Sequence, residues 1–199
     1  RPDDPANYVT WEEALNFCNW LSSRADLKRC YTSDAMTPEF PYIGLGEPPF
    51  IVESADGFRL PQPDQWARAC RAGSVTRFSF DDNFDRQRWE NLGRHAWFLL
   101  NTGDQLNPCG SRLPNGWGLF DMHGSLCEWC CEPDSAAAPG EHVAARAEVR
   151  SSDFQTPFSQ CTSDEITPVI DGRARDSQLM GFRILIPELP GGRGTESVD

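Results

Sequence analysis

The central part of the chain constrains its fold most, because it lacks the periodic runs that long helices and strands require. Residues 74–131 are rich in Gly, Asn, Asp and Trp, and their apolar residues recur at no fixed spacing. Such composition is typical of irregular loops. The 12 Phe and 7 Trp among 199 residues supply enough apolar surface for a core that anchors those loops. We therefore expect a globular, loop-rich fold.

Two helices are predicted before this region. The first spans about residues 11–23, because Thr10 and Glu13 form a T-x-x-E capping box. The apolar residues that fall on one of its faces are Trp11, Ala14, Phe17, Cys18 and Leu21. The second begins at Pro63, which suits a first helical turn, and ends at Gly73. Its inward-facing residues are Trp66, Ala69 and Cys70.

Short strands and long loops are predicted for the rest. Residues 58–61 read as a short strand leading into the second helix, and residues 182–186 as the best strand of the chain. Residues 31–57 are rich in Pro, Gly and Asp and read as a long loop, and residues 132–149 as a flexible surface insertion. Residues 187–199 read as a frayed tail. Two helices with short strands indicate the α+β class.

The charge and apolar pattern exclude several partners. The chain has 30 acidic and 18 basic residues, for a net charge of −12. This charge opposes binding to nucleic acid and to anionic membrane surfaces, because both rest on neutralising negative groups. No apolar run approaches the roughly 20 residues that a membrane-spanning helix needs. We expect neither a nucleic-acid partner nor a membrane partner.

Eight cysteines point to a reducing compartment. They are Cys18, Cys30, Cys70, Cys109, Cys127, Cys130, Cys131 and Cys161. A chain of this size with a good core does not need disulfides, and several of these residues lie in apolar stretches where buried thiols are common. The sequence therefore slightly favours the cytoplasm. The vicinal pair Cys130–Cys131 is expected to point its two thiols in opposite directions along an extended stretch.

An ordered set of short stretches resembles the formylglycine-generating enzyme (sulfatase-modifying factor) family. The stretches are Tyr8-Val-Thr-Trp-Glu-Glu-Ala, Phe17-Cys-Asn-Trp-Leu, Phe58-Arg-Leu-Pro, Trp66-Ala-Arg-Ala-Cys-Arg-Ala-Gly, His95-Ala-Trp-Phe, Asn101-Thr-Gly, Pro114-Asn-Gly-Trp-Gly-Leu-Phe-Asp-Met-His-Gly, Glu128-Trp and Gly181-Phe-Arg. The resemblance covers about residues 7–186 and implies a C-type-lectin-like fold. Members of this kind occur in bacteria. We expect one domain over residues 1–186, with the N-terminal part of the family domain missing.

A calcium site is expected within residues 121–128. Two carboxylates, Asp121 and Glu128, flank a glycine turn with accessible carbonyls, and Ca²⁺ prefers such oxygen ligands. The resemblance implies the ligands in detail: the Asp121 and Glu128 side chains and the carbonyls of Gly124 and Leu126. In the alternative interpretation, the two carboxylates cap turns or pair with arginine.

The resemblance also implies a second calcium site. It maps onto Asn91, the carbonyl of Leu92, and Asp104 or Gln105. The acidic ligand of the family falls on Gln105, with Asp104 one position away. Alternatively, these are hydrogen-bonded turn residues.

Formylglycine synthesis is not expected, and no copper is expected. Family enzymes hold Cu(I) between two cysteines five residues apart, and thiolates suit that ion. Here Thr156 stands at the first position, so only Cys161 remains. Asp153 replaces a family serine, and Cys127 replaces the family tryptophan between the calcium ligands. The family Gly-Gly turn is Ser151-Ser152, so even this tight turn is altered.

The cysteines also allow alternative chemistries. A divergent oxygenase or oxidase could use Cys161 with Cys127 as a new thiolate pair. A zinc site could use the C-x₂-C pair Cys127 and Cys130 as one half and Cys109 or His123 as the other, at no standard spacing. A disulfide among these cysteines is a further alternative. Serine hydrolysis lacks the Gly-x-Ser-x-Gly elbow.

Binding is the predicted role, because lectin-like folds present variable loops on a rigid scaffold. The residues expected at the groove are Asp153, Phe154, Thr156, Phe158, Cys161 and Cys127. The expected partner is a protein or peptide. The departures around residues 150–180 also fit a variable protein that diversifies its ligand, or a sensor module of a bacterial signalling or defence system. A purely structural or regulatory module, which contacts only neighbouring domains or subunits, is the third interpretation.

Overall fold

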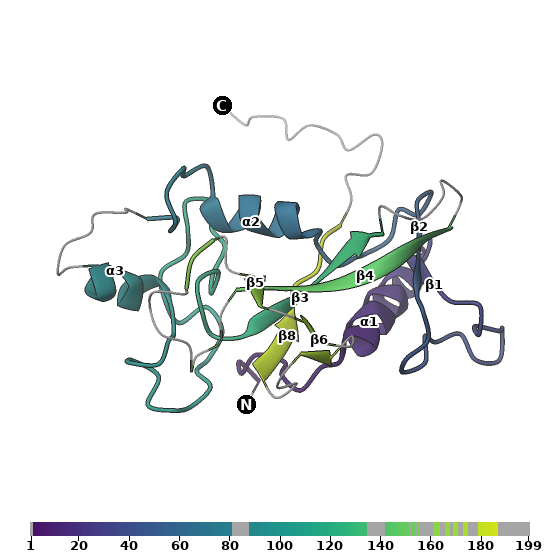
Figure 1. Ribbon diagram of the computed structural model, residues 1–199, viewed down its shortest axis with the longest axis horizontal. Coiled ribbons are helices and arrows are strands. Elements are labelled where there is room, and N and C mark those ends of the chain that lie inside the picture. The colour runs from purple at the N-terminus through teal and green to yellow at the C-terminus, as the bar shows by residue number, and fades with distance from the viewer. Residues whose placement is uncertain are drawn as a thin grey trace.

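A mixed sheet with helices on both sides organises the part of the chain that the structure describes (Figure 1). The computed structural model describes residues 2–80, 88–134, 142–151, 153, 155, 161–163, 166–167, 169–170, 173–174 and 179–186. The helices are α1 (Trp11–Arg24), α2 (Pro63–Arg71) and α3 (Arg88–His95). The strands are β1 (Tyr31–Thr32), β2 (Phe50–Val52), β3 (Cys127–Pro133), β4 (His142–Arg150), β5 (Ile166–Thr167), β6 (Val169–Ile170), β7 (Arg173–Ala174) and β8 (Met180–Phe182). The predicted α+β class is confirmed.

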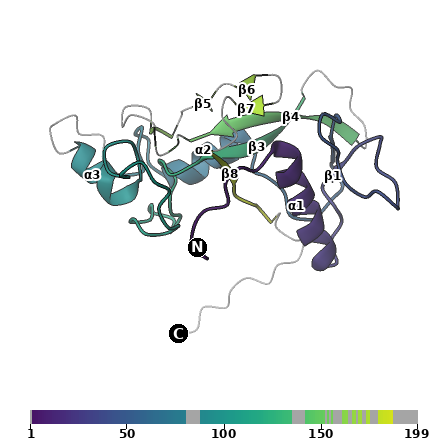
Figure 2. The same ribbon diagram turned by 90° about the horizontal axis from the view of Figure 1, so that it is seen from below.

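Strands β3 and β4 form the centre of the main sheet, whose order is β1-β2-β4-β3-β8 with β5 beside β4. They pair antiparallel from Glu128 opposite Arg150 to Pro133 opposite Ala145. Strand β8 runs parallel to β3, so the sheet is not purely antiparallel. Helix α1 and helix α2 cover opposite faces of this sheet, while α3 lies beyond one end of it (Figures 1 and 2).

The side chains on the two faces of β3 pack in different hydrophobic clusters. Cys127, Trp129 and Cys131 pack with α1 in the largest cluster, which also contains Val149 of β4. Cys130 packs with Trp66 and Cys70 of α2 in a separate cluster, together with Met122. Successive side chains of a strand point to opposite faces. The expectation that the thiols of Cys130 and Cys131 face opposite ways is therefore confirmed.

Helix α1 begins where the sequence predicts, and both hydrogen bonds of the Thr10–Glu13 capping box are present. Its buried face is rotated from the predicted one. Phe17 is 41 % exposed and packs against Trp20 and Phe182, with ring centroids 5.6 and 5.4 Å away. The residues that α1 buries are Trp11, Ala14, Leu15, Cys18, Asn19 and Ser22.

Helix α2 is also confirmed, with Pro63 in its first turn and Trp66 fully buried. Ala72 adopts a left-handed conformation (φ 50°) at its end, directly before Gly73. The predicted strand before this helix reduces to one bridge between Arg59 and Leu185. The terminal strand ends at Phe182, so its predicted extension to residue 186 is wrong.

Several segments differ from their predicted structure. The loop over residues 31–57 contains β1 and β2, and the irregular region over residues 74–131 contains α3. The predicted insertion over residues 132–149 is wrong for residues 132–133, which end β3, and for residues 142–149, which belong to β4, the longest strand of the described chain. Residues 135–141 and the predicted tail over residues 187–199 lie outside the described residues. Of the helices described, none has both the length and the apolar character needed to cross a membrane.

Candidate functional site

The first predicted calcium segment, residues 121–128, lines a pocket of about 480 Å³ together with residues 5–6 and 181–183. The pocket opens between residues 5–6, the loops at residues 109–110 and 118–121, and the β8 end at residues 181–183. Its wall also includes residues 124–126 and Glu128. All four predicted ligand positions, Asp121, Gly124, Leu126 and Glu128, therefore line one pocket.

Only one of the two carboxylate oxygens of Asp121 makes a hydrogen bond in the described structure. Its Oδ2 accepts a hydrogen bond from the Gly110 N–H at 2.8 Å. Its Oδ1 is buried and has no hydrogen-bond partner in the described structure. Burial raises the pKa of this carboxyl, because it removes water that would solvate the charge. A buried oxygen of this kind is costly unless an ion or a water satisfies it.

The turn that follows is fixed by its contact with Trp97. A Cβ added at Gly124 would lie 2.2 Å from the Trp97 carbonyl oxygen, so only glycine fits there. The next N–H, from Ser125 (φ 75°), donates to the same oxygen at 2.9 Å. The Leu126 N–H donates to the Gly124 carbonyl at 3.1 Å. The carbonyls expected as ligands therefore belong to a turn that packing holds in place.

Glu128 is paired with arginine, as the alternative interpretation of this segment anticipated. Its carboxylate accepts from the Trp66 Nε1–H at 2.7 Å and from the guanidinium of Arg183. Glu128 is only 8 % exposed. Each carboxylate oxygen has two lone pairs, so this pairing leaves capacity for a further ligand contact. An arginine partner was anticipated from the sequence, but Arg183 was not identified, although this residue belongs to the Gly181-Phe-Arg motif.

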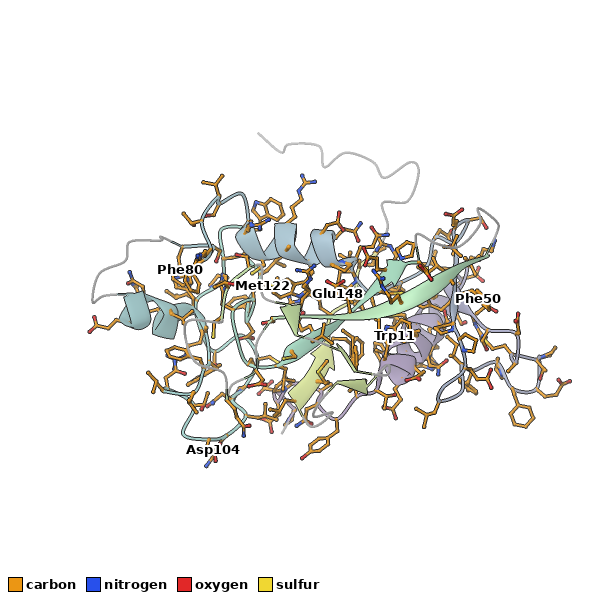
Figure 3. All side chains as sticks on the ribbon, viewed as in Figure 1. Trp11, Phe50, Phe80, Asp104, Met122 and Glu148 are labelled. Carbon is orange, nitrogen blue, oxygen red and sulfur yellow. The ribbon has the colours of Figure 1, made fainter. Side chains whose placement is uncertain are left out.

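The residues of the second predicted calcium site are not gathered by any contact described in the structure. Asn91 is exposed on α3, and the Leu92 carbonyl accepts from the N–H of Ala96, the residue directly after this helix, at 2.8 Å. Asp104 (φ 58°) lies on an exposed loop (Figure 3), where its Oδ1 accepts from Gln155 Nε2 at 3.4 Å. The neighbouring Gln105 carbonyl accepts from an asparagine side chain at 2.9 Å. The alternative of hydrogen-bonded turn residues describes these contacts.

The two cysteines of the predicted thiolate pair pack in different clusters. Cys127 lies in the α1-side core, and its Sγ is 3.8 Å from the Ser151 carbonyl. Cys161 packs with Phe78 and Phe98 beside α3. Ser151 keeps a left-handed turn (φ 69°), the region that glycine occupies most easily.

His123 connects Cys161 to the rest of the core. Its Nε2 accepts from the Ser79 N–H at 3.1 Å, so its Nδ1–H donates to the Cys161 carbonyl at 3.1 Å. Burial lowers the pKa of His123 to about 4, because the charged imidazolium would lose its hydration. This histidine is therefore neutral near pH 7, and its ring nitrogens are occupied by backbone groups.

The remaining groove and zinc candidates are scattered. Asp153 Oδ1 accepts from the Gln155 N–H at 2.8 Å, whereas Phe154, Thr156 and Phe158 lie outside the described residues. Cys109 is exposed at the rim of the 480 Å³ pocket, and the eight cysteines are present as thiols. Within the described ranges, no three His, Cys, Asp or Glu side chains form a group that could hold a metal ion.

Solved structures resemble this one over nearly its whole length. Treponema denticola variable protein 1 gives a TM-score of 0.71 at 21 % identity, and covers 92 % of this chain and 70 % of its own. CarF gives a TM-score of 0.66, and PvdO from Pseudomonas aeruginosa gives 0.62, each at 21 % identity and 92 % coverage of this chain. The alignments cover 67 % and 62 % of those two chains. These likenesses establish the fold.

Curated relatives are also similar in sequence. Chaperone protein LppX from Paenibacillus barcinonensis is 29 % identical over 149 residues, which are 64 % of this chain and 51 % of LppX. The formylglycine-generating enzyme of Bos taurus is 24 % identical over 136 residues, 65 % of this chain and 27 % of the enzyme. The chain thus spans about half the length of LppX and a smaller share of the length of the enzyme. The family model for the sulfatase-modifying factor enzyme 1-like domain matches residues 1–186, and the chain belongs to that family.

Proposed function

We propose that this chain is a polypeptide-binding domain on a calcium-stabilised scaffold, and that it does not generate formylglycine. The observation that carries the second part is that Cys161, the one cysteine that remains of the family pair, packs apart from Cys127, the thiol considered as its new partner. Cys127 packs in the α1-side core and Cys161 packs beside α3, while Thr156 stands where the family has its first catalytic cysteine. A hydroxyl does not replace a thiolate in a two-coordinate Cu(I) site.

The calcium part is supported by the unsatisfied Oδ1 of Asp121. This buried oxygen belongs to a residue that lines a pocket together with the Gly124–Leu126 turn. A hard cation fits carboxylate and carbonyl oxygens, and its charge would offset the cost of burying Asp121. Asp121 and the carbonyls of Gly124 and Leu126 would hold the ion. Glu128 would bind the ion through a remaining lone pair of its carboxylate and would keep its ion pair with Arg183.

The polypeptide ligand is supported by a relative whose name describes a chaperone. LppX is a chaperone protein by that name, and this chain resembles about half of it. The scaffold is well packed, whereas the residues that depart from the family pattern lie around residues 150–180. A rigid scaffold with divergent loops suits ligand binding.

Two assays test the absence of formylglycine synthesis and the binding of a polypeptide. The chain is incubated with Cu(I), oxygen and a cysteine-containing sulfatase peptide, and formylglycine is measured by mass spectrometry. We expect no product, and product formation would overturn the proposal. Binding is then measured with immobilised reduced, carboxymethylated α-lactalbumin, which is a non-native polypeptide. We expect Phe158→Ala to weaken retention about tenfold, and Phe40→Ala, which changes an aromatic side chain that is 73 % exposed, to leave it unchanged. Equal retention of both variants would contradict the groove assignment.

The calcium site is tested separately by isothermal titration. We expect one equivalent of Ca²⁺ to bind the wild-type chain. Asp121→Ala should abolish that binding, because it removes the predicted carboxylate ligand whose buried Oδ1 has no hydrogen-bond partner in the described structure. Asp34→Asn, which changes an exposed carboxylate elsewhere, is the matched control and should bind as the wild type does. Unchanged binding by Asp121→Ala would contradict the site.

A further inference from the structure

A second pocket, of about 310 Å³, lies between α3 and the chain that follows it. Helix α3 forms one end of the molecule, remote from α1 at the other end (Figures 1 and 2). Phe98 and Leu100 supply apolar wall, and two arginines, Arg94 and Arg112, also line the pocket. The single acidic residue in its lining is Glu90. Neither the calcium proposal nor the polypeptide groove involves these residues.

Arg112 is held in place by the ring of Trp97. The guanidinium carbon lies 3.6 Å from the ring centroid, which is a close cation–π contact. The indole is itself fixed, because its Nε1–H donates to Ser111 Oγ at 2.9 Å. Ser111 Oγ in turn donates to the Pro108 carbonyl at 2.6 Å. The loop therefore presents a guanidinium that loses little freedom when it binds a ligand.

The positive charge of Arg112 has no counter-charge in the part of the chain that the structure describes. Its Nε is buried without a hydrogen-bond partner. Burial lowers the pKa of this arginine, and no acidic group acts against that shift. Among the described residues, no ion pair joins Glu90 to Arg94 either, although they are four residues apart on α3. Two guanidiniums against one carboxylate leave this pocket positive in a chain of net charge −12.

We propose that this pocket binds a carboxylate that carries a small apolar group. A guanidinium offers two parallel N–H groups that match the two oxygens of a carboxylate. The apolar group would contact Phe98 and Leu100, and the pocket is at the small end of the range for ligand sites. A doubly charged phosphate is less suited, because Glu90 repels the second negative charge more strongly than it repels one. The shared chemistry occurs in a free short-chain acid and in the C-terminal carboxylate of a peptide that ends in an apolar residue.

Three compounds distinguish the chemistry and its source when they are titrated into the full chain. They are 4-methylpentanoate, the peptide acetyl-Ala-Ala-Leu with a free carboxylate, and the same peptide as its C-terminal amide. We expect at least one of the two carboxylates to bind. The amide should bind about tenfold more weakly or worse than the free peptide, because it loses a charge-assisted contact. Tighter binding of the peptide than of 4-methylpentanoate identifies a chain terminus as the ligand. Equal binding identifies the free acid.

Variants test the residues. Arg112→Gln should weaken carboxylate binding about tenfold or more. Arg112→Lys keeps the positive charge but loses the two parallel N–H groups of the guanidinium, and it should weaken binding less. Glu90→Gln should strengthen binding, because it removes the repelling charge. Arg68→Gln is the matched control, since Arg68 lies over Trp117 at 6.0 Å outside the pocket, and it should bind as the wild type does.

The proposal is overturned if neither carboxylate binds, if the amide binds as well as the acid, or if folded Arg112→Gln binds normally. If Arg112→Gln does not fold, Glu90→Gln and Arg112→Lys decide the question. Unchanged affinity in both would contradict the assignment.

Discussion

Asp121 and Glu128 are carboxylates of one pocket, yet their neighbours give them different roles. Glu128 is neutralised by Arg183 and the Trp66 N–H, so its charge is largely satisfied within the protein. Asp121 has one oxygen satisfied by the Gly110 N–H and one left buried without a partner. The spacing of the two acids is evident in the sequence, but the arginine that reaches Glu128 lies 55 residues later. Only the fold brings that charge to the site.

At the same scale, His123 makes the stability of the fold dependent on pH. Its folded pKa of about 4 lies below the ordinary value of 6.5, so the unfolded chain binds a proton more readily. Its contribution is therefore complete above pH 6.5 and is lost as the pH falls from 6.5 towards 4. The fall of the His123 pKa from 6.5 to about 4 corresponds to about 3 kcal/mol of stability. We expect urea unfolding, measured with excess chelator, to show such a decline in the free energy of unfolding over that interval.

The comparison for this prediction is His123→Gln, whose amide stays uncharged. We expect the variant to be less stable than the wild type at pH 7, because it fits the contacts with Ser79 and Cys161 imperfectly. It should lose less stability than the wild type between pH 6.5 and 4.5. An equal decline in both proteins would show that His123 is not the acid-sensitive group.

Among the elements, those with local sequence determinants were predictable and those set by tertiary pairing were not. The capping box of α1 and Pro63 of α2 act within a few residues, and both helices are where these features place them. The burial of Phe17 was predicted wrongly, because the side of α1 that meets the sheet depends on the neighbouring strands. Strand β4 was missed because its sequence, HVAARAEVR, is rich in Ala, and its pairing with β3 and β2 outweighs that propensity.

The turn at Gly124 gives a prediction at the scale of an element. Gly124→Ala would place a Cβ 2.2 Å from the Trp97 carbonyl oxygen, so either the turn or the Trp97 backbone must move. We expect a loss of about 2–3 kcal/mol in the free energy of unfolding. Gly116→Ala is the control, because its Cβ would have ordinary contacts, the nearest at 3.7 Å, and it should cost less than about 1 kcal/mol. Chemical denaturation of both variants measures the difference, and equal stability would contradict the structural role of this turn.

For the whole molecule, the resemblance noted in the sequence predicted the fold and the family, both of which are confirmed. The predicted residues of the first calcium site line a single pocket. No contact described in the structure brings together the predicted residues of the second calcium site. The carboxylate pocket was not predicted, because Arg112 and Trp97 belong to a loop whose sequence shows no periodicity. The molecule thus consists of a sheet with cores on both faces and a loop-rich end that carries Asp121 and Arg112, each of which has a buried polar atom without a hydrogen-bond partner in the described structure.

The most direct test of the calcium-stabilised scaffold is the metal content of the purified chain, followed by thermal melting with Ca²⁺ and with a chelator. The account predicts about one Ca²⁺ per chain. At a free Ca²⁺ concentration near 100 times the dissociation constant, binding adds about 2.7 kcal/mol of stability. For a chain of this size, that raises the melting temperature by about 5–10 °C over the chelated protein. In Asp121→Ala this difference should vanish. A chain that contains no calcium and melts at the same temperature with and without it would contradict the account.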